Sequence, residues 1–105
     1  MTNERRGNQR FPVNIDAVLS FRNHVIICAV KDLSVNGAFV EIPPEDMPHS
    51  NASVELGFTV NNNGESHHCR LPARIRRVSE SGAGVAFADI AMEDYLRLVD
   101  TVFHA

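Results

Sequence analysis

Apolar and polar residues alternate over several stretches of this chain. From Val13 to Phe21 every second residue is apolar, and Asn14, Asp16 and Ser20 lie between them. The same period of two runs from Val54 to Val60 and again from Cys69 to Ile75, inside a segment that spans 66–78. Successive side chains of a β-strand point to opposite faces, so each stretch is expected to be a strand with one buried face.

Three further apolar runs complete the predicted β-structure. The run "HVIICAV" at 24–30 is nearly continuous and rich in β-branched residues, which predicts a well-covered strand. Shorter strands are expected at "AFVEI", 38–42, and at "VAFA", 85–88. The stretches "PPEDMPHSN", "NNNG" and "SESGAG" between the runs are typical of loops and turns. About six short strands joined by turns predict an antiparallel barrel or sandwich.

The pattern changes towards the C-terminus. Apolar residues there recur at a spacing of three or four, which predicts an amphipathic helix over about 90–104 with Asp89 as its N-cap. This helix is expected to close an open end or side of the β-structure. The first residues are polar, so 1–12 are predicted to be a flexible N-terminal arm and 13–105 the folded domain. The apolar stripe consists of Met92, Tyr95, Leu96, Val99, Val102 and Phe103.

Length and composition limit the class of protein. At 105 residues, with 44% hydrophobic and 22% charged residues, the chain is expected to be one soluble globular domain. No stretch approaches the roughly 20 apolar residues of a membrane span, and the N-terminus lacks the apolar core of a secretory signal. We therefore predict a cytoplasmic protein with no membrane insertion.

The cysteine and histidine residues do not predict a metal site. Cys28 and Cys69 lie far apart, and in a small cytosolic domain we interpret both as buried apolar residues. "HHC" at 67–69 falls on a predicted strand, where neighbouring side chains point to opposite faces and cannot share one ion without distortion. No metal cofactor is expected.

The kind of positive charge is more informative than its amount. The net charge of −3 argues against a general polynucleotide-binding protein. Nine of the ten cationic residues are arginine, however, and most belong to two clusters. A guanidinium is a planar fork that matches a phosphate or the guanine edge. The clusters are interpreted either as two solvated faces or as a compact anion site: Arg5, Arg6 and Arg10, and Arg70, Arg74, Arg76 and Arg77.

The stretch "DLSVNG" interrupts the strands between 24–30 and 38–42. Taken alone it is most simply a loop, because Asp and Ser side chains bond to nearby amides and Gly tolerates unusual backbone conformations. Just before the first strand, however, "RGNQR" places Arg6 and Arg10 four residues apart. The two patterns together predict more than a turn.

In this order the two motifs resemble the PilZ domain family, whose signature is an R-x-x-x-R arm followed by a [D/N]-x-S-x-x-G turn. The arm is Arg6–Arg10 and the turn is Asp32–Gly37. "FPVNIDAVL" and "ARIRRVSESGAGVAFADI" are also of the family's kind, so the resemblance extends from Glu4 to the terminal helix. It implies a six-stranded antiparallel β-barrel with a C-terminal helix, and binding of the bacterial second messenger cyclic di-GMP.

The resemblance also implies roles for single residues. Arg6 and Arg10 are the candidates for pairing with phosphate oxygens or with guanine O6 and N7. Asp32 accepts hydrogen bonds and suits the N–H groups of the guanine edge. Ser34 is expected to contact the same base or to fix the loop. Gly37 is expected to let the backbone turn sharply and the base lie close.

A further arginine bears on the number of ligands. In relatives, an arginine directly before R-x-x-x-R accompanies binding of two stacked ligands, and Arg5 stands at that position. We therefore predict two cyclic di-GMP molecules per chain. Arg74 and Arg76 share a face of one predicted strand while Arg77 opposes them, and the sequence leaves open whether any of the three contacts ligand.

The predicted function is a receptor and not an enzyme, because no histidine pairs with a nucleophile and no phosphate loop is present. Ligand is expected to order the arginine arm against the turn and to change the surface offered to a downstream partner protein, which the sequence does not identify. Two alternatives stay open. One is a PilZ-type interaction adaptor that binds no ligand. The other is a small barrel that binds single-stranded nucleic acid, for which the chain has few aromatic residues.

Overall fold

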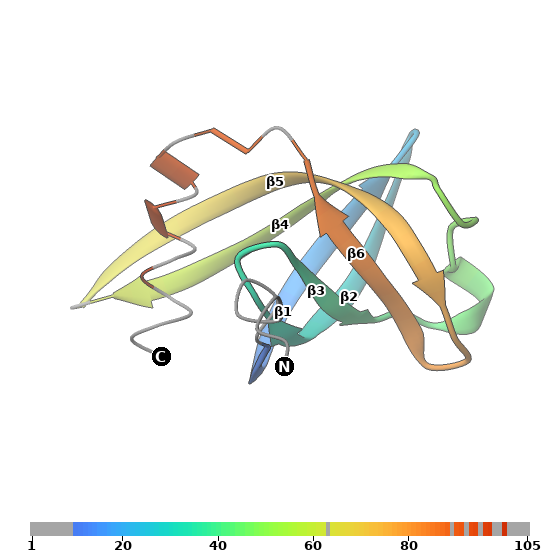
Figure 1. Cartoon of the computed structure of the whole chain (residues 1–105), viewed down its shortest axis with the longest axis horizontal. Helices are drawn as coiled ribbons and strands as arrows, with labels where there is room; N and C mark the ends of the chain where they lie inside the picture. The colour runs from blue at the N-terminus through green and yellow to red at the C-terminus, as the bar shows by residue number, and fades with distance from the viewer. Residues whose placement is uncertain are drawn as a thin grey trace, which may run out of the picture.

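Six antiparallel strands form a closed barrel in the order β1-β2-β3-β6-β5-β4 (Figure 1). This computed structural model describes residues 10–62, 64–88, 90–91, 93–94, 96–97 and 100. The closed strand order confirms the predicted six-stranded antiparallel barrel. The strands are β1 (Phe11–Phe21), β2 (His24–Leu33), β3 (Gly37–Glu41), β4 (Ser53–Asn62), β5 (Glu65–Val78) and β6 (Gly82–Phe87), with one 3₁₀ turn, η2 (Pro44–Asp46).

Alternate residues of every strand fill the barrel. Leu19, Val30, Leu56 and Leu71 have no exposed surface, and their sequence neighbours on the strands are more exposed. Burial of such side chains stabilises by about 1.5–3 kcal/mol each, so this interior supplies most of the driving force for folding. The apolar residues that alternate along β1, β4 and β5 in the sequence are the ones whose side chains point into this core.

One prediction about coverage is wrong. The run 24–30 was expected to be well covered, yet Val25 is 68% exposed and Ile27 is 75% exposed. Only Ile26, Cys28 and Val30 of this run point into the barrel. The outer face of β2 has no covering layer among the described residues, so its apolar side chains meet solvent.

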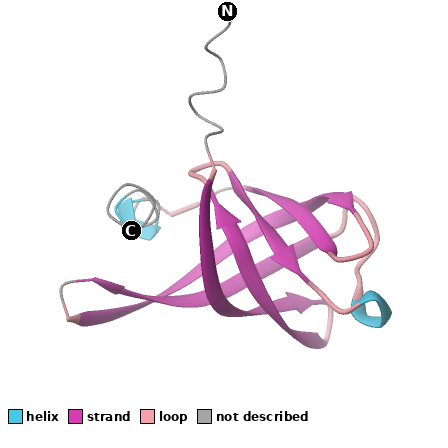
Figure 2. Ribbon diagram, turned by 90° about the horizontal axis from the view of Figure 1, so that it is seen from below, coloured by secondary structure: helices cyan, strands magenta, loops and turns pink. Residues whose placement is uncertain are grey.

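The barrel is closed unevenly. β4 and β5 pair over ten residues each, from Ser53 opposite Arg74 to Asn62 opposite Glu65. β1 and β4 pair only where Ala17–Ser20 faces Glu55–Phe58. The far half of the β4–β5 hairpin therefore projects beyond the barrel as a two-stranded ribbon (Figures 1 and 2). Gly64 in its turn has a φ of +81°, the conformation for which glycine is suited.

The two ends of the chain fall largely outside the described residues. The strand predicted from Val13 begins at Phe11, and the rest of the predicted arm is not described apart from Arg10. In the C-terminal segment Glu93, Asp94, Leu96, Arg97 and Asp100 have helical backbone. They do not make a continuous described helix, so the predicted helix over 90–104 is not supported as an element and stays a prediction. Within the described residues, no helix has the length and apolarity to span a bilayer.

Candidate functional site

A one-residue bulge in β2 turns Asp32 to the outside of the barrel. Val30 pairs with Val40 of β3 and Asp32 pairs with the next residue, Phe39, so Lys31 is extra. Strict alternation from the buried Val30 would point Asp32 inwards. The bulge restores Leu33 to the core and leaves Asp32 half-buried on the outer surface. Asp32 is thus part of a strand and not of the turn that the sequence predicts.

A second bulge has the same effect on β5. Ile75 pairs with Val85 of β6, and Arg77 pairs with the next residue, Gly84, so Arg76 is extra. Ile75 is fully buried, whereas Arg76 and Arg77 are both exposed. Sequence parity placed these two arginines on opposite faces. The bulge puts both outside.

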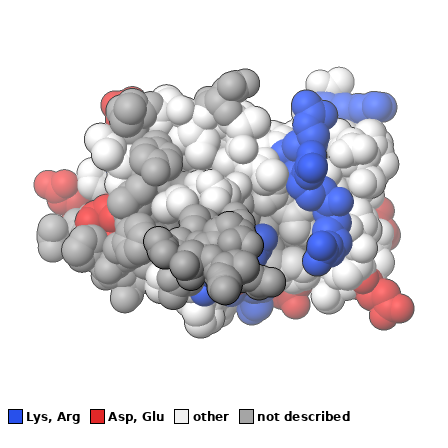
Figure 3. Space-filling model, in the orientation of Figure 1, with Lys and Arg blue, Asp and Glu red and all other residues white. Residues whose placement is uncertain are grey.

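The two bulges bring opposite charges to the two sides of one groove. The pairings place Asp32 beside Phe39, Phe39 beside Gly84, and Gly84 beside Arg77, in one row across β2, β3, β6 and β5. Arg10, Asp32, Arg76 and Arg77 line this groove, which encloses about 410 Å³. Figure 3 shows basic side chains gathered in a band on this face of the molecule. We call this hollow the arginine groove.

Small residues form the floor of the arginine groove. Gly84 and Ala86 of β6 line it next to the half-buried ring of Phe39. An added Cβ at Gly84 would lie 3.8 Å from the Cβ of Arg77, which is an ordinary contact, so packing does not require glycine there. A flat floor beside an aromatic ring is suited to a planar base.

Ser34 holds the turn that follows Asp32. Its side chain is 2% exposed, and its Oγ accepts from the backbone N–H groups of Asn36 and Gly37 at 3.2 and 3.1 Å. Oγ also donates to the Gly37 carbonyl oxygen at 3.1 Å, and the Ser34 N–H donates to the same oxygen at 2.8 Å. Of the two roles predicted for Ser34, these bonds favour fixing the loop.

Gly37 is needed for packing against β6. It is absent from the residues with positive φ, so the backbone here does not need the left-handed conformation that glycine tolerates. A Cβ on Gly37 would instead overlap the backbone carbonyl oxygen of Val85. The Asn36 carbonyl accepts from the N–H of Phe87 at 2.9 Å, which fastens the same turn to β6. The turn is therefore a rigid wall of the groove.

Arg10 and Asp32 form an ion pair across the first two strands. Pro12 lies opposite Asp32 in the β1–β2 register, which brings the residue just before β1 alongside this carboxylate. Arg10 Nη1 donates to Asp32 Oδ1 at 2.7 Å, and the backbone N–H of Phe39 donates to the same oxygen at 3.2 Å. The remaining N–H groups of the Arg10 guanidinium and the second oxygen of Asp32 point to no other described partner, and both residues line the groove.

The arginines of β5 separate into two pairs. Arg70 donates to Glu55 at 2.9 Å and Arg74 donates to the Asn51 carbonyl at 2.9 Å, so both are bound to the β4 side of the barrel. Arg76 and Arg77 line the groove, and the described residues offer neither of them a hydrogen-bond or ion-pair partner. The sequence left open which of these arginines contacts ligand. The structure places Arg76 and Arg77 in the lining of the groove, whereas Arg74 is not part of that lining.

The predicted site residues are therefore only partly brought together. Arg10, Asp32, Ser34 and Gly37 line one hollow. Arg5 and Arg6 lie outside the described residues. Phe39, Gly84, Arg76 and Arg77 complete the groove. The sequence offered no signal for the first two, because their contribution depends on strand register.

The remaining chemistry-bearing groups are inside the barrel or scattered. No group of three potential metal ligands occurs among the described residues. Burial raises the pKa of the Cys28 thiol to about 11. Burial also raises the pKa of Cys69, which Asp94 raises further and Arg97 lowers. Both thiols are free and buried, as predicted.

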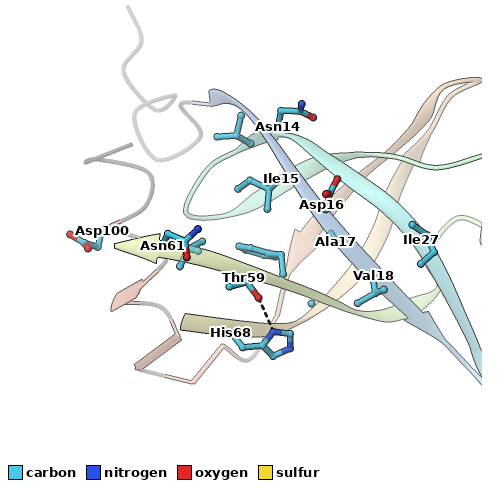
Figure 4. A pocket seen from close by; sticks show the side chains of 14 residues that line it. Asn14, Ile15, Asp16, Ala17, Val18, Ile27, Thr59, Asn61, His68 and Asp100 are labelled. Atoms are coloured by element: carbon cyan, nitrogen blue, oxygen red, sulfur yellow. Dashed lines mark hydrogen bonds between the residues drawn. The ribbon is translucent and has the colours of Figure 1, made fainter. Parts of the chain in front are cut away.

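A larger hollow, of about 1060 Å³, lies elsewhere, at the seam between β1 and β4 (Figure 4). Asp16 and Asp100 supply carboxylates to its lining, and none of its described lining residues is Lys or Arg. Carboxylates repel a phosphodiester, so size alone does not make this hollow an anion site. The arginine groove is smaller but has the matching charge.

The model of the PilZ domain family matches residues 4–104. The fold resembles the crystal structure of the PilZ domain of CeSA from a cellulose-synthesising bacterium, with a TM-score of 0.71 and 20% identity over 91% of this chain and 96% of that one. It also resembles the Bacillus subtilis inhibitor of motility MotI/DgrA, with a TM-score of 0.80 and 18% identity over 90% of this chain. This chain spans only 48% of that second protein. Among curated proteins, none matches the sequence.

Proposed function

The chain belongs to the PilZ domain family, a family of cyclic di-GMP receptors, and from this premise we propose that it binds cyclic di-GMP in the arginine groove. The observation that carries the proposal is the meeting of the two motifs: Arg10 and Asp32 are joined at 2.7 Å on one wall of a groove that also holds Arg76 and Arg77. Three guanidinium groups converge there with one carboxylate.

The groove offers a partner for each part of the ligand. Phosphodiester oxygens accept charge-assisted bonds from arginine, and guanine O6 and N7 accept two parallel bonds from one guanidinium. The guanine N–H groups need an acceptor, which Asp32 supplies. Gly84 and Phe39 leave a flat floor for the base. Arg6 is proposed to add a further phosphate contact from the arm, as the family motif implies.

Two ligand molecules per chain are proposed, because Arg5 extends the arginine cluster beyond the R-x-x-x-R pair. Arg76 and Arg77 support this stoichiometry, since they add two guanidinium groups on the side of the groove opposite Asp32. With Arg5, Arg6 and Arg10 they make five guanidinium groups, which suit the four phosphodiester charges of two dinucleotides better than the two charges of one. Calorimetry that saturates at one ligand per chain contradicts this part of the proposal alone.

Binding is proposed to act as a switch on the arm. Ordering a residue costs about 1–2 kcal/mol, so several charge-assisted bonds must offset the ordering of residues near Arg5 and Arg6. Arg10 is already held by Asp32, so it anchors the arm at the groove. Amide NMR tests the switch: ligand must shift the signals of residues 4–12, and unmoved signals contradict it.

Binding without catalysis is the expected outcome. Among the described residues that line the groove, only Ser34 has a hydroxyl, and it is buried and bonded to the backbone of its own turn. No described histidine lines the groove to activate it.

The ligand is a bacterial intracellular messenger, which agrees with the cytoplasmic location that the sequence predicts. A ligand-free adaptor stays the second candidate. The similarity to an inhibitor of motility agrees with a motility partner for either function.

Calorimetry with cyclic di-GMP is the test of the proposed function. The intact chain is compared with Arg6→Ala, Asp32→Ala and Arg77→Ala, with Arg70→Ala as the matched control on the same strand. Each of the first three should lose about 1–3 kcal/mol of binding free energy, since charged partners are left unpaired. Arg70→Ala should bind as the native chain does. No heat of binding from a correctly folded native chain overturns the proposal and favours the adaptor.

A further inference from the structure

The seam between β1 and β4 is where the barrel is least complete. Beyond the four paired residues, neither 11–16 of β1 nor 59–62 of β4 pairs with the other strand. The large hollow lies along this gap, with Ile15 and Val60 among its apolar lining (Figure 4). An unpaired strand edge presents backbone N–H and C=O groups that another strand can pair with.

The two edges of this gap differ in regularity. β1 carries Pro12 and an irregularity in its β2 register between Pro12 and Ile15, features that disfavour pairing with a further strand. Residues 59–62 of β4 continue in unbroken register with β5. The β4 edge is therefore the one suited to accept an added strand.

The chemistry around the hollow indicates what kind of strand fits. Ile27, which is 75% exposed, and Val18 form an apolar wall above the floor at Gly57. Asp16 is exposed on the same side, and Asp100 stands at the far end. Thr59 and His68, joined by a 3.3 Å hydrogen bond, form the opposite wall (Figure 4). An apolar inward face together with the exposed Asp16 carboxylate on the outward face favours alternating apolar and basic side chains.

We propose that the seam hollow binds an extended segment of a partner protein, with alternating apolar and basic residues, as a strand added to 59–62 of β4. Main-chain bonds to the β4 edge would supply affinity, and the apolar side chains would face inwards to Ile15 and Val60 while the basic ones face outwards to Asp16. The inference depends on the proposed function in one respect: it takes this surface as the place where the receptor contacts its downstream partner protein. A second copy of this chain is a poorer occupant, because its own acidic rim would face Asp16.

A defined peptide pair tests the proposal. Acetyl-(Lys-Val)₃-amide and acetyl-(Glu-Val)₃-amide are titrated separately into the intact ¹⁵N-labelled chain. The lysine peptide should shift the amides of 59–62 in a saturable way that weakens with added salt, and the glutamate peptide should not. Asp16→Lys should reduce the affinity of the lysine peptide about fivefold or more. The matched control Asp46→Lys makes the same charge change on the exposed η2 turn and should leave the affinity unchanged.

Each other outcome overturns the proposal. If both peptides bind equally well, or if amide signals change only at the arginine groove, no charge-matched segment binds at the seam. If the amides of 59–62 are strongly protected from hydrogen exchange in the free chain, the β4 edge is already covered by a terminal segment of the chain itself. A dimer in sedimentation that Ile27→Lys dissociates assigns the surface to a second copy. Calorimetry of Asp16→Lys with cyclic di-GMP keeps the two proposals apart, because this variant should bind the nucleotide normally.

Discussion

Arg10 Nη1 lies 2.7 Å from Asp32 Oδ1, so the residue that precedes β1 is paired with the carboxylate that the β2 bulge turns outwards. This contact joins the two sequence motifs directly. The same Asp32 oxygen accepts the N–H of Phe39, which fixes the carboxylate against β3. The pair thus presents a donor fork and an acceptor side by side, the arrangement that a guanine edge and a neighbouring phosphate require.

The Arg10–Asp32 pair should matter for binding far more than for folding. The two side chains are 47% and 31% exposed, and pairs of this kind stabilise a protein by roughly 0–1 kcal/mol. Urea unfolding of Arg10→Ala, Asp32→Ala and the double variant should give a coupling energy in that range. Calorimetry of the same variants should show larger losses of cyclic di-GMP affinity. A coupling energy well above this range would show that the pair contributes mainly to the stability of the fold, which contradicts the prediction.

Ser34→Ala should destabilise the fold. The hydroxyl is the acceptor for two backbone N–H groups in a buried turn, and leaving such donors unpaired costs about 1–3 kcal/mol. Ser79→Ala is the control. Ser79 donates its N–H and its hydroxyl to the Gly82 carbonyl oxygen, as Ser34 does to that of Gly37, but Ser79 is exposed. Water can replace its hydroxyl, so the free energy of unfolding should change by about 0.5 kcal/mol or less. Equal losses in the two variants would contradict this assignment.

Two glycines on the outer face of the barrel should respond differently to a methyl group. Gly37→Ala places its Cβ against the Val85 carbonyl oxygen, and overpacking of this kind costs about 1–3 kcal/mol or more. At Gly84 the nearest atom is 3.8 Å away, so Gly84→Ala should be neutral or slightly stabilising. Thermal unfolding of both variants checks the difference. A destabilised Gly84→Ala would show that packing, and not the groove, requires this glycine.

The buried thiol of Cys28 should make stability fall at high pH. Its pKa is raised from 9.0 to about 11 in the folded chain, so between these values the unfolded chain gives up a proton that the folded chain keeps. The stabilising contribution is full below about pH 9 and is lost as pH rises towards 11. The slope is about 1.4 kcal/mol per pH unit. Urea unfolding of the native chain and Cys28→Ala from pH 8 to 11 measures it, and identical slopes would contradict the prediction.

The sequence predicts the barrel well because each strand has one buried face. The alternation in β1, β4 and β5 reports burial directly, and the turn at Gly64 is signalled by its residues. The outer exposure of Val25 and Ile27 was not predictable in the same way. An apolar run has the same appearance whether a layer covers it or not.

The site was predictable only through its motif residues. Asp32 and Gly37 belong to a recognisable pattern, whereas the contribution of Arg77 depends on a bulge that shifts β5 against β6 by one residue. Alternation counted along the chain gives such a residue the wrong face. The reason for Gly37 was also hidden, because the clash it avoids involves Val85, which is 48 positions further along the chain.

The bulges at Lys31 and Arg76 imply an unusual tolerance of single-residue deletions. Removing either residue would leave a regular strand pair in which Asp32 still pairs with Phe39, or Arg77 with Gly84, so each side chain would keep its place on the outer face. Loss of Lys31 would spare the groove, whereas loss of Arg76 would remove one of its guanidinium groups. A homologue one codon shorter at either place is therefore expected to keep both the architecture and the charged side chain that follows the bulge.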